Sequence, residues 1–205
     1  MKQLLTSIFL SVSIHLLAQL PSECIEFKNG QTNKYTSDGS GKSQGLKFSI
    51  KYPQSYSSKE GERPHIARKF SSGGEKCDIV ITILKLPEAP SASEKKDALS
   101  KSSLLEMVPS TAKALTATDG LIIDGEPAGF IEHYMNRKAN AGEQTVTIRA
   151  YSRVYCIFYK DYLIQISFGV GSTTANDASL KARFDNYKFL FSYVINSFVI
   201  LSKWQ

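Results

Sequence analysis

The sequence contains few of the residues from which catalytic and metal sites are usually built. Its 205 residues include three cysteines, three histidines and one tryptophan. Residues 41–45 read GKSQG, which has the spacing of the G-x-S-x-G nucleophile motif, but no buried strand is expected before this segment, as that motif requires. No cysteine–histidine pair has a known local signature. We therefore predict no enzymatic activity, no catalytic residue and no cofactor. An unrecognised hydrolase stays open as a third interpretation, because one sequence does not reveal which side chains have shifted pKa values.

Metal ligands are equally sparse. A zinc site needs three or four converging ligands. On its expected strand, His133 shares a face with Ile131 and Met135, whereas Glu132 points to the opposite face. This pattern is typical of a packed histidine, so we predict no metal; His65 or a cysteine would have to supply the missing ligands.

Long apolar runs are scarce too. The run at residues 4–17 is shorter than the roughly 20 residues that a membrane-spanning helix needs. It follows Lys2 and precedes the small residue Ala18, which is the order of a secretory signal. We predict that residues 1–19 are a signal peptide and that the protein is exported, either periplasmic or secreted. No transmembrane segment is expected after signal cleavage.

The three cysteines that follow this signal are Cys24, Cys77 and Cys156. An odd number permits at most one disulfide within the chain, and Cys24 is the first candidate for it. Cys77 and Cys156 lie in strand-like runs and are expected to be small buried apolar residues.

Two glycine-containing segments resemble phosphate-binding loops only in part. Residues 39–43 read GSGKS, but the position five before Gly41 is Thr36 where the complete motif has glycine. Residues 169–174 read GVGSTT and join an antiparallel strand to a helix, whose N-terminus could hold an anion. The third glycine is missing, so a plain strand-to-helix connection is favoured.

The positive charge of the chain is scattered. Twenty-five Lys and Arg against 19 Asp and Glu give a formal net charge of +6. The densest basic stretch, with Lys95, Lys96 and Lys101, is interrupted by Asp97. A nucleic-acid-binding protein would gather this charge on one face. We predict no nucleic-acid partner, and an acidic partner or an anionic membrane remains the alternative to a plain solvated surface.

The order of the expected elements divides the chain into three parts. Residues 20–44 are expected to form a short N-terminal strand at 24–27 and a flexible linker at 29–44, and residues 45–205 one domain. Expected strands lie at 46–51, 64–71, 77–86, 129–137, 143–159 and 162–170, and expected helices at 91–107 and 177–196. Ser91 and Glu94 form a capping box at the start of the first helix.

The hairpin around Lys160 and Asp161 is the most informative segment. Pairing about this reversal places Phe158 opposite Leu163, Cys156 opposite Gln165 and Tyr155 opposite Ile166. Neither face of the resulting strands is polar, so helices should cover both faces of the sheet. The predicted fold class is therefore α+β, an antiparallel sheet with helices on both faces in an α/β/α sandwich.

One stripe on this hairpin is the candidate for a ligand- or partner-binding site. It combines arginine and tyrosine, which suit partner surfaces and anion pockets. The alternative is a sheet face covered by a helix, with the arginines at its rim. The stripe consists of Arg149, Tyr151, Arg153, Tyr155 and Tyr159.

The order of these segments resembles the PsbP-like fold. The resemblance covers about residues 45–200 and rests on five segments: LKFSIKYPQSY (46–56), CDIVITILKL (77–86), IIDGEPAGFIEHYM (122–135), YKDYLIQISFGV (159–170) and FSYVINSFVI (191–200). It implies a non-enzymatic module that binds or helps to assemble a protein partner. No functional residue of the photosynthetic members can be transferred.

Our first hypothesis is therefore an exported binding or assembly module with a protein partner in the envelope or outside the cell. The second is a periplasmic binder of a small or anionic ligand, using the arginine–tyrosine stripe or the start of the helix after Thr174. The third is the unrecognised hydrolase.

Overall fold

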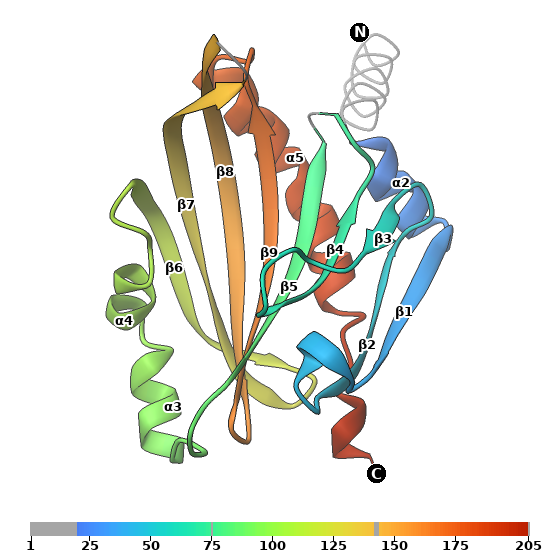
Figure 1. Ribbon diagram of the computed structural model, residues 1–205, viewed down its shortest axis with the longest axis vertical. Coiled ribbons are helices and arrows are strands. Elements are labelled where there is room, and N and C mark those ends of the chain that lie inside the picture. The colour runs from blue at the N-terminus through green and yellow to red at the C-terminus, as the bar shows by residue number, and fades with distance from the viewer. Residues whose placement is uncertain (1–19, 75, 142–143, 205) are drawn as a thin grey trace, which may run out of the picture.

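A seven-stranded antiparallel sheet forms the centre of the protein (Figure 1). The structure is a computed structural model that describes residues 20–74, 76–141 and 144–204. Its helices are α2 (Ser22–Lys28), α3 (Ala92–Ala98), α4 (Lys101–Glu106) and α5 (Asp177–Ile195), with 3-10 turns η1 (Gly41–Ser43) and η2 (Leu201–Lys203). Its strands are β1 (Thr32–Asp38), β2 (Lys47–Pro53), β3 (Ser57–Lys59), β4 (Ile66–Ser71), β5 (Cys77–Lys85), β6 (Ala112–Ile123), β7 (Glu126–Ala141), β8 (Gln144–Tyr159) and β9 (Tyr162–Ser172). The strand order in the sheet is β3-β4-β5-β9-β8-β7-β6, so the predicted α+β class with an antiparallel sheet is confirmed.

The β8–β9 hairpin has the predicted register. Phe158 pairs with Leu163, Cys156 with Gln165 and Tyr155 with Ile166. The preceding hairpin reverses at Asp124 and Gly125, and both residues have positive φ (49° and 76°). An Asp-Gly pair is favoured in such a two-residue turn because it tolerates this backbone conformation.

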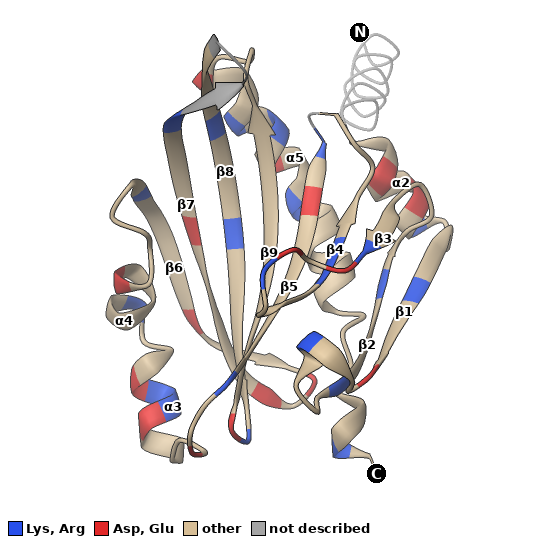
Figure 2. Cartoon of the chain, in the orientation of Figure 1, with Lys and Arg blue, Asp and Glu red and all other residues tan. Residues whose placement is uncertain are grey.

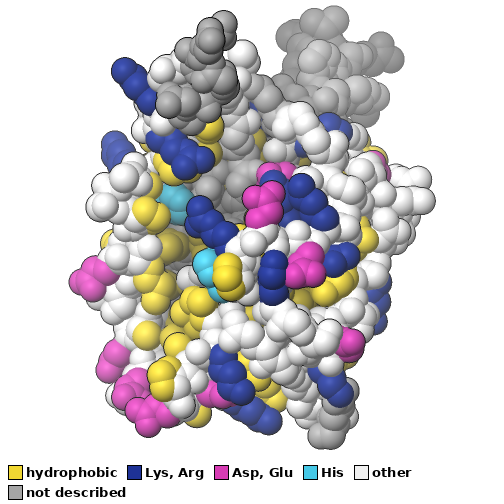
Figure 3. Space-filling view, in the orientation of Figure 1, with side chains coloured by type: hydrophobic (Ala, Val, Ile, Leu, Met, Phe, Trp, Pro, Cys, Tyr) yellow, Lys and Arg dark blue, Asp and Glu magenta, His cyan; other side chains and the backbone are white. Residues whose placement is uncertain are grey.

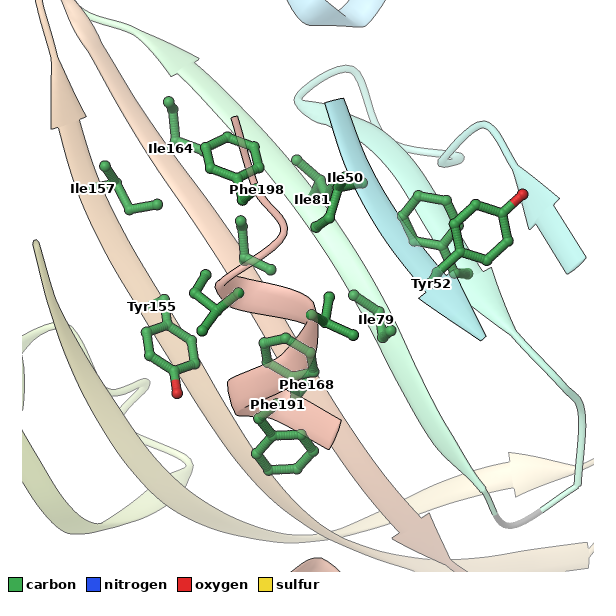
Figure 4. Packing of buried hydrophobic residues seen from close by; sticks show 14 of the residues in the cluster. Ile50, Tyr52, Ile79, Ile81, Tyr155, Ile157, Ile164, Phe168, Phe191 and Phe198 are labelled. Carbon is green, nitrogen blue, oxygen red and sulfur yellow. The ribbon is translucent and has the colours of Figure 1, made fainter. Parts of the chain in front are cut away.

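The main core lies between α5 and one face of the sheet. Burial in β9 alternates strictly, with Phe168 and Val170 inaccessible to solvent. The Phe168 ring stacks on Phe191 of α5, and Tyr155 of β8 meets Phe168 edge-on (Figure 4). The predicted C-terminal helix is confirmed, and Asn176 caps it by accepting a hydrogen bond from Ser179 N.

The N-terminal part of the chain differs from its prediction. Residues 24–27 belong to helix α2, not to a strand, because Glu23 and Cys24 face α5 while Ile25 is 45% exposed. Within the predicted linker, β1 pairs with β2 along its whole length. Its polar composition suggested a loop, but the main-chain pairing of a strand does not require apolar side chains.

The opposite face of the sheet is covered in part by α3 and α4. Leu99 and Leu104 pack on Ile131 and Cys156 of that face. An added Cβ at Gly129 of β7 would lie 2.7 Å from Leu104 Cδ1, so glycine allows α4 to approach the strand. The predicted capping box of Ser91 and Glu94 is present. Ser100 caps a second helix, which divides the predicted single helix into two.

Three sequence predictions concern the compartment of the protein. The predicted signal peptide, 1–19, lies outside the described residues, and export remains a prediction. Among the helices that the structure describes, none is both long and apolar enough to cross a membrane. Cys24, Cys77 and Cys156 are all buried and free. Cys24 therefore forms no disulfide and serves as a packed apolar residue beside α5.

A buried carboxylate fastens α2 to the rest of the fold. The Glu23 side chain is 1% exposed, contacts Lys76 Nζ at 2.6 Å and accepts a hydrogen bond from Tyr187 Oη at 3.2 Å. Burial by itself would raise the pKa of Glu23, but Lys76 and the hydrogen bonds outweigh it and lower that pKa below 4.5.

We expect Glu23→Ala to lower the free energy of unfolding by about 1–3 kcal/mol at pH 7, because it leaves Tyr187 without its acceptor. Since the pKa of Glu23 is lower in the folded state, its carboxylate stabilises the fold above pH 4.5, and this contribution is lost as the pH falls through the folded pKa. Urea denaturation at pH 7 and at pH 3 measures both effects. The exposed Glu62→Ala is the control, and a difference that does not shrink at low pH would contradict the assignment.

Candidate functional site

The structure places most of the predicted arginine–tyrosine stripe beneath α5. Tyr151, Tyr155 and Tyr159 are 5–8% exposed. The Tyr151 ring packs on Phe184 of α5. The three tyrosines therefore belong to the core and offer a partner little accessible surface.

Arg153 in the same stripe is part of a buried ion-pair network. Its Nε lies 2.9 Å from Glu132 Oε1, and the two side chains are 12% and 5% exposed. Lys188 of α5 approaches the same carboxylate at 3.1 Å. The guanidinium also lies over the Phe130 ring, 4.3 Å from its centroid. These contacts join β7, β8 and α5, so they give Arg153 a structural role.

Arg149 is the accessible member of the stripe. It pairs with Asp177 at 3.3 Å, and the two side chains are 31% and 59% exposed. Asp177 also accepts a hydrogen bond from the Tyr134 hydroxyl. Of the five residues in the stripe, a partner could therefore reach only Arg149, at the start of α5.

The two arginines should differ strongly in their effect on stability. We expect Arg153→Ala to destabilise the protein by about 3 kcal/mol, because among the described residues it leaves the buried Glu132 with Lys188 as its one remaining cationic partner. Arg149→Ala removes a solvent-exposed pair and should cost at most about 1 kcal/mol. Chemical denaturation of the two variants tests this, and equal losses would show that the Glu132 network is not a buried anchor.

The opposite face of the sheet is only half covered, and we call it the open face. It includes one row of cross-strand neighbours: Asp78 (β5), Gly169 (β9), Ser152 (β8) and His133 (β7). The residues of β9 on this face are all half-buried, whereas those on the α5 face are buried. Figure 3 shows apolar side chains gathered in a recess on this side. Cover on both faces was predicted, and α3 and α4 supply it at one end of this face only.

A hollow of about 350 Å³ lies at the other end of the open face. Its floor is formed by Gly169 and Gly171 of β9, and we call it the glycine hollow. The remaining lining residues are Gly74, Lys76, Asp78, Ile148, Ser172 and Thr173.

The backbone conformation does not require glycine at Gly169 or Gly171. Neither has a positive φ, and a Cβ at Gly169 would meet only Ser152 Oγ at 3.8 Å. A Cβ at Gly171 would meet Arg149 O at 3.4 Å, an ordinary contact. Glycine in a strand interior is unfavourable and often marks a close approach of another group. The fold has room for a side chain at both positions. The hollow therefore exists because the sequence has glycine there.

The segment 169–174 had been a minor candidate for anion binding. In the structure it continues β9 to Ser172, whose hydroxyl accepts hydrogen bonds from Thr174 N and Ala175 N. Asn176 then caps α5. Ser172 and Asn176 thus accept hydrogen bonds from N–H groups that a phosphate-binding loop would offer to an anion. This favours a simple strand-to-helix connection over an anion site. Sequence reasoning missed Lys76, Asp78 and Ile148, which only the pairing of distant strands brings to these glycines.

His133 is the buried polar residue of the open face. It is 9% exposed, and its Nδ1 has no hydrogen-bond partner. Burial lowers its pKa, because the charged imidazolium would be poorly solvated there. It shares its face with Ile131 and opposes Ser152, as predicted for a packed histidine. Among the described residues, no group of three or more His, Cys, Asp and Glu is placed to hold a metal ion.

Two glycines of the open face give a matched test of this geometry. We expect Gly169→Ala to raise stability by about 0.5 kcal/mol, because alanine is favoured over glycine in a strand and has room here. Gly129→Ala should lower it by about 1–3 kcal/mol, because its Cβ would crowd Leu104 and Thr118 O at 2.8 Å. Thermal or urea denaturation measures both, and a destabilised Gly169→Ala would contradict an open hollow.

The fold has counterparts among solved structures, although its sequence has none in known families. No family model matches the chain, and no curated protein matches it by sequence. The Saccharomyces cerevisiae Ran-binding protein Mog1p matches with a TM-score of 0.50 and 14% identity, over 83% of this chain and 95% of that one. A point mutant of Mog1 matches with a TM-score of 0.47 and 14% identity, over 82% and 96%. A Bacteroides thetaiotaomicron protein matches with a TM-score of 0.38 and 13% identity, over 83% and 48%. The match to Mog1p shows a Mog1/PsbP-like fold and nothing further.

Proposed function

We propose that the protein is an exported, non-enzymatic binding module that holds an acidic protein partner on the open face of its sheet. The observation that carries this proposal is the asymmetry of β9, which is fully buried on one face and half-exposed along the other. Soluble proteins rarely leave a large apolar patch exposed unless another molecule binds there. An uncovered, partly apolar sheet face therefore favours binding of a partner.

The shape of the open face favours a protein over a small molecule. The glycine hollow is shallow, and the half-exposed row of Ser167, Val154 and Val80 extends the surface beyond it. Small-molecule sites are usually deeper and surround most of the ligand. A partner could instead lay a segment along the face and insert one side chain between Ile148 and Asp78.

The charge around the hollow favours an acidic partner. The chain carries a formal net charge of +6. Arg137 is exposed on the same face, directly opposite Ile148, and has no acidic partner among the described residues. Lys69 and Lys76 stand at the other side, where Asp78 and Glu23 balance them. In Figure 3, basic side chains border the recess, with acidic side chains among them on one side. Complementary charge increases the rate and the specificity of association.

Two further facts support binding rather than catalysis. Burial raises the pKa of the Cys24 and Cys156 thiols to about 11 and that of Cys77 well above its ordinary value, so their thiolates are scarce at neutral pH. Mog1p, which has this fold, is by its name a Ran-binding protein. The fold can therefore support protein binding, although Ran itself is not implied for this chain.

Site-specific photo-crosslinking tests the proposal in cells that make the protein. A benzophenone side chain placed at Ser167, on the open face, should form a covalent adduct with an acidic protein, whereas the same group at the exposed Ser192 of α5 should not. Gly169→Val, which fills the hollow, and Arg137→Glu should each reduce the adduct about tenfold. Adducts of equal yield from both positions, or an adduct unchanged by both variants, would contradict the proposal.

A further inference from the structure

Helix α3 covers its part of the protein poorly. Its sequence, ASEKKDA, has no large apolar residue, and none of its seven residues is buried. The helix is fixed by its capping box and by the following helix α4, whose Leu104 does pack on the sheet. A helix that is polar all round leaves the apolar surface beside it without cover.

Two hollows result, one on each side of α3, and we call them the α3 hollows. The first, of about 340 Å³, lies between α3 and the β6–β7 hairpin and includes Leu99, Leu121, Ile122 and Pro127 in its lining. Ile122 is 69% exposed at its rim.

The second hollow, of about 580 Å³, lies on the other side of the helix. Leu86, Pro87, Phe158 and Leu163 are part of its lining. Both hollows thus expose apolar side chains of the sheet at one end of the molecule.

The charged side chains around the α3 hollows are mostly acidic, on a protein that is basic as a whole. The first hollow is lined by Asp97, Asp119 and Lys96, and the second by Glu88 and Glu94 without a basic residue. None of these four carboxylates takes part in an ion pair among the described residues, unlike Glu23 and Glu132. Figure 2 shows acidic residues on α3 and Figure 3 shows them gathered on that side of the surface.

We propose that the α3 hollows bind a protein segment in which apolar side chains are interspersed with lysine or arginine. The apolar side chains would enter the hollows on both sides of α3, and the cationic groups would meet the carboxylates that form no ion pair among the described residues. Such contacts combine apolar anchors with complementary charge, as in other peptide-binding grooves. The acidic rim disfavours anionic lipid or nucleic acid as the occupant. The α3 hollows lie at the opposite end of the sheet from the glycine hollow, so the protein would connect a basic partner with an acidic one.

The test uses the purified protein and two fluorescein-labelled synthetic peptides, one of alternating leucine and lysine and one with glutamate in place of lysine. Fluorescence anisotropy at low and at physiological salt measures their dissociation constants. The leucine–lysine peptide should bind saturably and more weakly as salt increases, and the leucine–glutamate peptide at least about tenfold more weakly.

Variants locate the binding surface. Asp97→Lys with Asp119→Lys reverses the charge of the first hollow, and Ala92→Trp fills it without changing charge. Each should weaken binding of the leucine–lysine peptide about tenfold. The control pair Glu62→Lys with Glu106→Lys changes the net charge equally but outside both hollows. It should alter the dissociation constant of the leucine–lysine peptide less than about twofold. Gly169→Val should leave that dissociation constant unchanged.

Three outcomes would overturn the proposal. They are the absence of saturable binding, equal binding of the two peptides, and an equal loss of binding in the control pair. Loss of binding in Gly169→Val alone would move the peptide to the glycine hollow and likewise reject the α3 hollows. Circular dichroism of each variant confirms that it is folded.

Discussion

The packing of α5 on one face of β8 and β9 is the constraint on which the rest of the structure depends. The Phe168 ring stacks on Phe191 across this interface, Phe191 in turn packs on Phe184 of the same helix, and none of the three is accessible to water. Because side chains alternate along a strand, burying this face fixes which residues of the hairpin point the other way. The α5 interface thereby determines both the core and the composition of the open face.

Buried carboxylates fix the elements around this core in their places. Glu132 joins β7 to Arg153 of β8 and to Lys188 of α5, and Glu23 joins α2 to Lys76 and Tyr187. A charge that is buried against several donors costs much to leave unpaired, so such a site tolerates few alternative arrangements. Both carboxylates connect segments that lie far apart in the sequence. Neither network adds cover to the open face.

The two surfaces that we assign to partners have a common physical origin. Each lies where the chain supplies residues too small or too polar to complete the burial of the sheet: Gly169 and Gly171 at one end, and helix α3 at the other. The surroundings differ in charge, with Arg137 beside the glycine hollow and Asp97 and Asp119 beside the α3 hollows. This separation of charge on one sheet suits a module that brings two different partners together.

Local patterns in the sequence determined much of the fold. The alternation of apolar residues gave the register around Lys160, and helical spacing gave α5, because both depend on neighbours within a few residues. Composition alone misassigned α2 and β1. The burial of Cys24 depends on α5, far along the chain, and the main-chain pairing of β1 with β2 leaves no mark on its polar composition. The same limit applies to the candidate sites. The sequence identified the alternation that carries Arg153 and Tyr155, but which face α5 would cover was decided by tertiary packing. That packing buried the predicted stripe apart from Arg149 and left the glycines of β9 open, because a helix can lie on only one side of the strands that it covers.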